Sequence, residues 1–153
     1  MIFVGLQAAG KSTFYRERFF ATHLRINLDM FKTRHRENRF LQACLEARQP
    51  FVVDNTNATR LERQVYIEAA RHAGFRVIGY YFQSRVEDCK RRNEQRPADE
   101  QIPVRGILGT AGRMERVSRE EGFDELFYVR IDETNRFVVE EWKIVVEEWK
   151  DEV

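Results

Sequence analysis

The sequence contains little cysteine and no long hydrophobic run. Its two cysteines, Cys44 and Cys89, lie far apart and form no Cys-x-x-Cys or Cys/His cluster. This argues against a structural zinc site and favours a reducing compartment. No apolar run approaches the ~20 residues that a membrane helix needs, and the apolar opening, residues 1–4, is too short for a signal-peptide core. We therefore expect a cytoplasmic protein with no membrane partner.

Short apolar runs alternate with longer amphipathic ones along the chain. The apolar runs predict five strands, at residues 1–4, 25–29, 51–53, 77–82 and 125–131. The amphipathic runs predict four helices, at residues 11–22, 37–48, 59–73 and 86–94. This alternation predicts an α/β fold with a parallel five-stranded sheet and helices on both faces. Because the 153 residues contain no linker or low-complexity stretch, we expect a single domain over 1–153.

The acidic C-terminal segment, about 133–153, contains a short sequence repeat. The sequence Val-Val-Glu-Glu-Trp-Lys occurs at 138–143 and again at 145–150. On a helix, one stripe would contain Val139, Trp142, Val146 and Trp149. Alternatively, 132–135 is a turn and 137–142 returns as a strand. In either case we expect the segment to pack on the domain or to serve self-association into a homo-oligomer, rather than to hold a cofactor.

The strongest motif is Gly5-Leu6-Gln7-Ala8-Ala9-Gly10-Lys11-Ser12-Thr13. It matches the phosphate-loop spacing G-x-x-x-x-G-K-[ST], with an apolar run before it and a helical pattern after it. Such a loop points backbone N–H groups at phosphate oxygens, and the next helix adds its positive end. Lys11 would place a cation on the β and γ phosphates, and the Ser12 hydroxyl would ligate Mg²⁺. ATP and Mg²⁺ are therefore the expected cofactors. The nucleotide-binding residues in this stretch are Gly5, Gln7, Ala8, Ala9, Gly10, Lys11, Ser12 and Thr13.

Two predicted strands end in aspartate, at Asp29 and Asp54. Ligands of an open parallel sheet bind outside the carboxyl ends of its strands, so both carboxylates should face the phosphate loop. One can orient Mg²⁺ or its waters, and the other can accept the proton of an attacking hydroxyl. Spacing alone leaves open which carboxylate does which, and a capping role for one of them is the alternative.

Two basic stretches accompany these carboxylates. Arg92 and Arg96 lie four residues apart and share a helix face. A flexible stretch up to Pro103 follows, which predicts a lid whose Arg96 stabilises charge on the transferred phosphoryl group. A second basic run after Asp29 contains Lys32, Arg34, Arg36 and Arg39. If Asp29 faces the acceptor, this run is placed to hold an acceptor phosphate. The alternatives are surface ion pairs for the first stretch and an exposed helix face for the second.

The net charge of +1 conceals an uneven distribution. Residues 1–119 carry 22 Lys and Arg against 13 Asp and Glu, whereas residues 120–153 carry 4 against 12. A basic body suits a polyanionic substrate, although a nucleotide kinase also needs arginines for ATP alone.

Taken together, the phosphate loop, Asp29, the stretch Asp54-Asn55-Thr56-Asn57 and Arg92-Asn93-x-x-Arg96 resemble the 5′-polynucleotide kinase family. The similarity runs from residue 1 to about 131. It implies a P-loop NTPase three-layer sandwich with an arginine-bearing lid, which transfers the γ-phosphate of ATP to a 5′-hydroxyl nucleic-acid end. In this resemblance Asp29 is the general base, Lys11 and Arg96 are catalytic, and Arg92 lies beside the nucleotide. The expected metal ligands are Ser12 and Asp54. The residues expected to bind the acceptor are Asp29, Lys32, Arg36, Asp54 and Asn55.

One position departs from the family pattern. Three residues past the general base, phage polynucleotide kinase has an arginine that binds the acceptor's 3′-phosphate, and here that position is Lys32. A lysine keeps the charge but loses the two-pronged geometry. Acceptor recognition can therefore differ. A kinase for a sugar, nucleoside or other metabolite remains the alternative function, and a non-catalytic nucleotide-sensing protein is a third.

Overall fold

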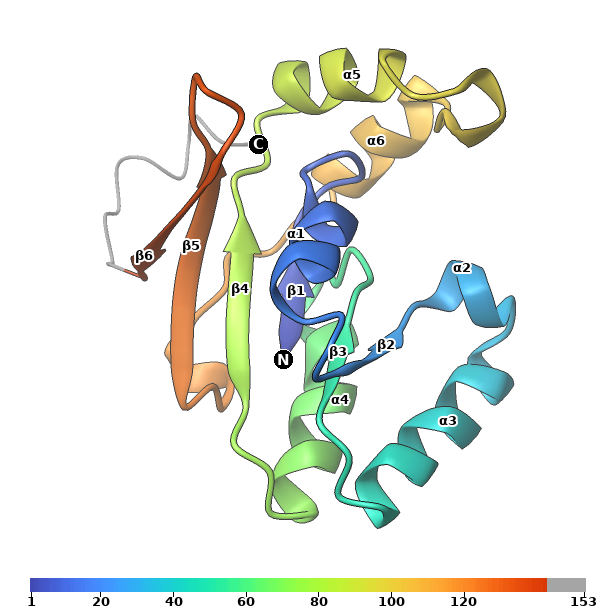
Figure 1. Ribbon diagram of the computed structural model, residues 1–153, viewed down its shortest axis with the longest axis vertical. Helices are drawn as coiled ribbons and strands as arrows, with labels where there is room; N and C mark the ends of the chain where they lie inside the picture. The colour runs from blue at the N-terminus through green and yellow to red at the C-terminus, as the bar shows by residue number, and fades with distance from the viewer. Residues whose placement is uncertain (143–153) are drawn as a thin grey trace.

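The strands form one six-stranded sheet in the computed structural model, which describes residues 1–142 (Figure 1). The strand order is β2-β3-β1-β4-β5-β6. The first five run parallel, and β6 is antiparallel to β5. The strand bounds are β1 Ile2–Val4, β2 Leu24–Ile26, β3 Phe51–Val53, β4 Ile78–Phe82, β5 Glu125–Ile131 and β6 Phe137–Glu141. The predicted α/β fold is confirmed, with one strand more than expected.

Helices cover both faces of the sheet and give three layers. Apolar side chains of α3 (Arg34–Glu46) and α4 (Arg60–His72) share one buried cluster with the sheet. On the opposite face, the second cluster contains side chains of α1 (Lys11–Arg18), α5 (Val86–Glu94) and α6 (Val104–Ala111). The remaining helical elements are short: α2 Leu28–Phe31 and two 3₁₀ turns, Ala98–Glu100 and Arg119–Glu121. The three-layer sandwich is thus confirmed.

The sixth strand shows which of the two alternatives, helix or strand, holds for the segment after residue 136. After a turn in which Asp132 accepts the backbone N–H groups of Thr134 and Arg136, the chain returns as β6 rather than as a helix. Val139 lies opposite Val129 of β5, and Trp142 packs against Tyr81. The strand alternative is therefore correct, with β6 ending at Glu141, one residue earlier than expected. Val146 and Trp149 lie outside the described residues.

Three other expectations need correction. The strand expected over 25–29 ends at Ile26, because the side chain of Asn27 accepts the backbone N–H of Met30 and caps the short helix α2. The first helix ends at Arg18 rather than near residue 22. The sequence reading also missed α6, whose Ile107, Thr110 and Ala111 are buried.

A fully buried ion pair holds α4 in the fold. Arg63 is 0% exposed, and its guanidinium donates twice to the Glu121 carboxylate, at 2.6 and 2.8 Å. It also donates to the carbonyls of Asn57 and Ala58, both at 3.0 Å. Buried charges are tolerated only when they are paired and hydrogen-bonded, as here. Arg63 thereby fixes the turn that follows β3.

Replacing Arg63 with methionine should destabilise the protein strongly, because Glu121 would be left as an unpaired buried charge. We expect the free energy of unfolding to fall by about 3–5 kcal/mol, measured by chemical denaturation. The matched control is Arg71→Met on the same helix, whose partly exposed pair with Asp124 should contribute under about 1 kcal/mol. Equal losses in the two variants would contradict a structural role specific to Arg63.

Candidate functional site

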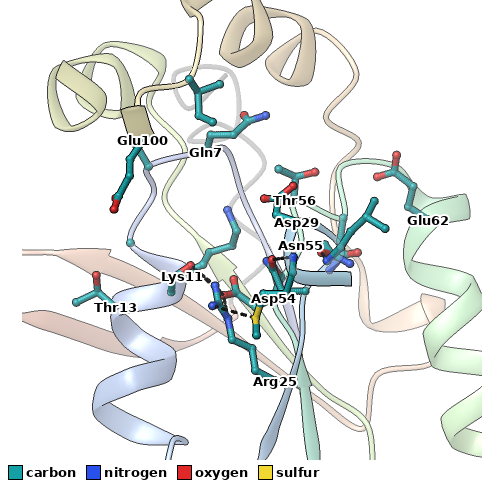
Figure 2. A pocket seen from close by; sticks show the side chains of 18 of the residues that line it. Gln7, Lys11, Thr13, Arg25, Asp29, Asp54, Asn55, Thr56, Glu62 and Glu100 are labelled. Atoms are coloured by element: carbon teal, nitrogen blue, oxygen red, sulfur yellow. Dashed lines mark hydrogen bonds and ion pairs between the residues drawn. The ribbon is translucent and has the colours of Figure 1, made fainter. Parts of the chain in front are cut away.

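The cavity that holds the predicted site lies beyond the carboxyl ends of the parallel strands. The chain segments that leave β1 and β3, which are neighbours, run in opposite directions across the sheet, and open α/β sheets bind ligands at such a switch point. The cavity has a volume of about 870 Å³. Its lining includes Lys11, Ser12, Arg25, Asp29, Lys32, Arg34, Asp54, Asn55, Arg96 and Arg113. Figure 2 shows side chains from the phosphate loop, α2 and the turn after β3 around it.

The phosphate loop has the curled backbone that its sequence predicts. Gly5 and Gly10 have φ values of 154° and 98°, and a Cβ on Gly10 would lie 3.0 Å from the ring of Phe137. Ala8, with φ of 61°, adopts a left-handed conformation that is uncommon for a residue other than glycine. The loop leads directly into α1, so its backbone and the positive end of that helix face the same cavity.

Lys11 is buried at the base of this loop. Its ammonium group donates to the carbonyls of Gly5 at 2.8 Å and Leu6 at 2.6 Å. Burial lowers the pKa of Lys11 to about 8, although the nearby Asp54 carboxylate raises it. The side chain therefore lies near the boundary between its charged and neutral forms at mildly alkaline pH.

Ser12 and Asp54 meet across the floor of the cavity. The Ser12 hydroxyl donates to Asp54 Oδ2 at 2.9 Å, and Asp54 is 2% exposed. Arg25 of β2, which the sequence reading did not select, contacts both groups (Figure 2). A hydroxyl and a carboxylate oxygen are the hard donors that Mg²⁺ prefers, so this pair fits a magnesium ion. In the described part of the chain, no group of three His, Cys, Asp or Glu side chains could hold a metal, so most ligands would come from phosphate and water.

The turn Asp54-Asn55-Thr56-Asn57 joins the parts of the site, and each residue has a separate partner. Asp54 bonds to Ser12, as above. The Asn55 side chain accepts the backbone N–H of Leu28 at 2.8 Å. The Thr56 carbonyl accepts the backbone N–H of Gly5 at 3.0 Å, and Asn57 donates to the Phe3 carbonyl at 2.7 Å. The sequence marked this stretch as distinctive, but only the structure shows that it attaches α2 and the phosphate loop to β3.

Asp29 lies in the first turn of α2, not at the end of a strand as the sequence suggested. Its side chain is exposed and lines the cavity that Lys11 also lines. Two bonds fix the start of its helix: Asn27 donates to the Asp54 carbonyl, and Leu28 donates to Asn55. The structure thus brings Asp29, Lys11 and Asp54 to one cavity, although Asp29 reaches it from a helix.

A buried polar network supports α2 from beneath. The Glu37 carboxylate accepts hydrogen bonds from Asn55 at 2.7 Å, the Tyr66 hydroxyl at 2.9 Å and Arg34 at 2.8 Å. Burial, followed by the nearby Glu37 charge, raises the pKa of Tyr66. The network links α3 and α4 to the same Asn55 that holds Leu28, and nothing in the sequence pattern indicated it.

The segment after α5 carries Arg96 to the cavity. Asn93 is buried and makes two hydrogen bonds to the backbone of Ile102, at 2.8 and 2.9 Å. Gln101 donates to the Arg96 carbonyl at 2.9 Å. The stretch expected to be flexible therefore contains a 3₁₀ turn and is closed at its base. Arg96 lines the cavity from this segment.

The other basic residues divide between the cavity and the surface. Lys32 lines the cavity and ends α2 with a left-handed φ of 66°. Arg92 and Arg36 are not among the residues that line it. Arg113, which the sequence reading missed, does line it and pairs with Glu62 at 3.1 Å. Its position after the unpredicted helix α6 explains why no motif indicated it.

These features define an ATP-binding, kinase-like P-loop domain. The chain belongs to the AAA domain family, whose model matches residues 26–120. It is also 26% identical over 127 residues to a bifunctional polynucleotide phosphatase/kinase of Schizosaccharomyces pombe, a match that covers 80% of this chain. The chain spans about a third of the length of that relative, 31%. The resemblance to polynucleotide kinases is thereby confirmed, as a distant one.

Solved structures with the same fold cover nearly the whole chain. Kti12 of Chaetomium thermophilum in complex with ADP-AlF₃ aligns with a TM-score of 0.67 at 15% identity, over 99% of this chain and 98% of that one. The AvrRxo1-ORF1:-ORF2 complex with ATP aligns with a TM-score of 0.70 at 14% identity, over 99% of this chain and 62% of that one. At these identities the likeness shows the fold. None of the helices described in residues 1–142 has the length and apolarity to cross a membrane.

The lowered pKa of Lys11 predicts how nucleotide binding depends on pH. Above pH 8 the amine of the free protein is neutral and must take up a proton before it can bind phosphate. The affinity for ADP in metal-free buffer should therefore fall as pH rises from 8 to 10, by up to about tenfold per pH unit. Calorimetric titration measures this. In Lys11→Met, whose side chain does not titrate, the affinity should be weaker and this slope should be absent. An identical slope in both proteins would contradict the assignment.

Proposed function

We propose that this protein transfers the γ-phosphate of ATP to the 5′-hydroxyl end of a nucleic acid. The observation that carries the proposal is the shared cavity of Asp29, Lys11 and Arg96. A carboxylate, a buried cation and an arginine around one space are the groups that phosphoryl transfer to an alcohol requires.

In the proposed phosphoryl transfer, each group of residues has its own role. The loop from Gly5 to Thr13 holds the triphosphate with its backbone N–H groups, and Lys11 neutralises the β and γ phosphates. Asp29 takes the proton of the attacking hydroxyl. Ser12 and Asp54 would hold Mg²⁺, which supplies charge neutralisation between the phosphates when bound. Arg96 stabilises negative charge on the transferred group.

The choice of a nucleic-acid acceptor is supported by three observations. Lys32, Arg34 and Arg113 line the cavity in addition to Arg96, with Arg34 paired to Glu37 and Arg113 paired to Glu62. Residues 1–119 carry a net charge of +9, from 22 basic and 13 acidic side chains. The relative from Schizosaccharomyces pombe is a polynucleotide phosphatase/kinase. A polyanion is the acceptor that suits this charge.

An acceptor panel tests the proposal. With radiolabelled ATP and Mg²⁺, we expect label on 5′-hydroxyl oligonucleotides, and we expect it to fall steeply as salt rises because a polyanion releases counterions on binding. Sugars, nucleosides and other metabolites form the second arm, read by ADP release. Label on no DNA or RNA end, single or double stranded, would exclude the nucleic-acid acceptor, and turnover of a metabolite would replace it with a small-molecule kinase.

Asp29→Asn should abolish transfer and leave ATP affinity nearly unchanged, because it removes a proton acceptor and keeps the shape of the side chain. The control is Asp88→Asn on α5, whose carboxylate pairs with Arg91 at the surface. If Asp29→Asn retained more than about a tenth of the wild-type rate, Asp29 would not be the general base.

Arg96→Ala should lower kcat by at least ~10³-fold, since it removes charge stabilisation from the transition state. Arg91→Ala is the matched control, because that side chain is 67% exposed and pairs with Asp88 three residues away. Single-turnover kinetics at saturating ATP separates the chemical step from binding. A similar small loss in both variants would remove Arg96 from the mechanism.

A further inference from the structure

Arg25 reaches from the sheet to the two groups on the cavity floor. Its side chain lies over the ring of Tyr15, with 5.8 Å between the guanidinium carbon and the ring centroid. Its Nε donates to Asp54 Oδ2 at 2.8 Å, and its Nη2 lies 2.6 Å from the same oxygen. Nη2 also donates to Ser12 Oγ at 2.8 Å. One guanidinium therefore contacts both oxygens at once (Figure 2).

Those two oxygens are the ones to which the proposed function assigns Mg²⁺, so this inference rests on that proposal. Ser12 Oγ and Asp54 Oδ2 are 2.9 Å apart, and Asp54 is almost completely buried. A guanidinium and a divalent cation on the same buried oxygens would repel each other, because the low local dielectric screens their charges weakly. The contacts of Arg25 and those of a metal are therefore in competition.

A comparison with Arg63, which is fully buried, shows why Arg25 can move. Arg63 is 0% exposed, pairs with Glu121 and is not among the residues that line the cavity. Arg25 is 26% exposed, lines the cavity, and its Nη1 lies 3.6 Å from the thioether of Met30 on α2. A partly exposed side chain with space beside it can leave its partners, whereas an enclosed one cannot.

We propose that Arg25 competes with the divalent cation for Ser12 and Asp54 and is displaced when the metal binds with the nucleotide. The guanidinium neutralises Asp54 until then. Metal alone binds weakly, because it must replace an arginine already hydrogen-bonded to its ligands. A metal that arrives with a di- or triphosphate brings phosphate oxygens as additional ligands, and these offset the loss of the Arg25 contacts.

Manganese binding to the full chain tests this inference without any phosphoryl transfer. Electron paramagnetic resonance measures the Kd of Mn²⁺ with and without ADP for the wild type, for Arg25→Gln and for the control Arg130→Gln. Arg130 pairs with Glu140 on the exposed β5–β6 hairpin. We expect Arg25→Gln to bind Mn²⁺ alone at least about tenfold more tightly than the wild type, and Arg130→Gln to match the wild type. An affinity of Arg25→Gln that is unchanged within about twofold, or weaker, overturns the inference.

A second measurement uses the wild type and does not depend on the folding of a variant. The Nε–H of Arg25 donates to Asp54, so its NMR signal reports that bond. Saturating Mg²⁺ and ADP should shift this signal and speed its exchange with water, whereas ADP alone should not. A signal that stays in place with Mg²⁺ and ADP overturns the inference while leaving the proposed function intact. If neither the wild type nor Arg25→Gln binds Mn²⁺ with ADP, the proposed function itself fails.

Discussion

The site depends on a four-residue turn, Asp54 to Asn57, which follows the third strand. Its side chains and carbonyls bond to the phosphate loop, to the end of β1 and to the start of α2. Arg63, fully buried, holds the far side of the turn. Because the partners come from separate segments of the chain, a shift of this turn would move the phosphate loop and α2 together.

The second constraint on the site is that charged side chains lie buried beneath the phosphate loop. Lys11 and Asp54 are both buried, and the partly exposed Arg25 bonds to Asp54 at the floor of the cavity. Burial lowers the pKa of Lys11 to about 8, and the nearby Asp54 carboxylate offsets part of that lowering. In such a weakly screened environment, a buried cation interacts strongly with an anion such as a phosphate group.

The two sides of the cavity differ in how they are built. One side consists of backbone from the phosphate loop and α1. The overall fold that holds it recurs in solved structures of 14–15% identity, with TM-scores of 0.67 and 0.70. The other side carries side chains of α2 and α3, supported by the Glu37 and Tyr66 network. The first side therefore depends on backbone conformation, and the second depends on the side chains that line it.

The sequence alone determined the α/β alternation, the phosphate loop and the importance of the stretch after β3, because these are local patterns of period and spacing. It did not determine that Asp29 lies on a helix, since a side-chain cap from Asn27 overrode the strand pattern. The positions of Arg25 and Arg113 at the cavity came only from the tertiary structure, and so did the choice of a strand over a helix for residues 137–141. Each depends on contacts between residues distant in sequence, and no local pattern records which distant carboxylate or strand a side chain will meet.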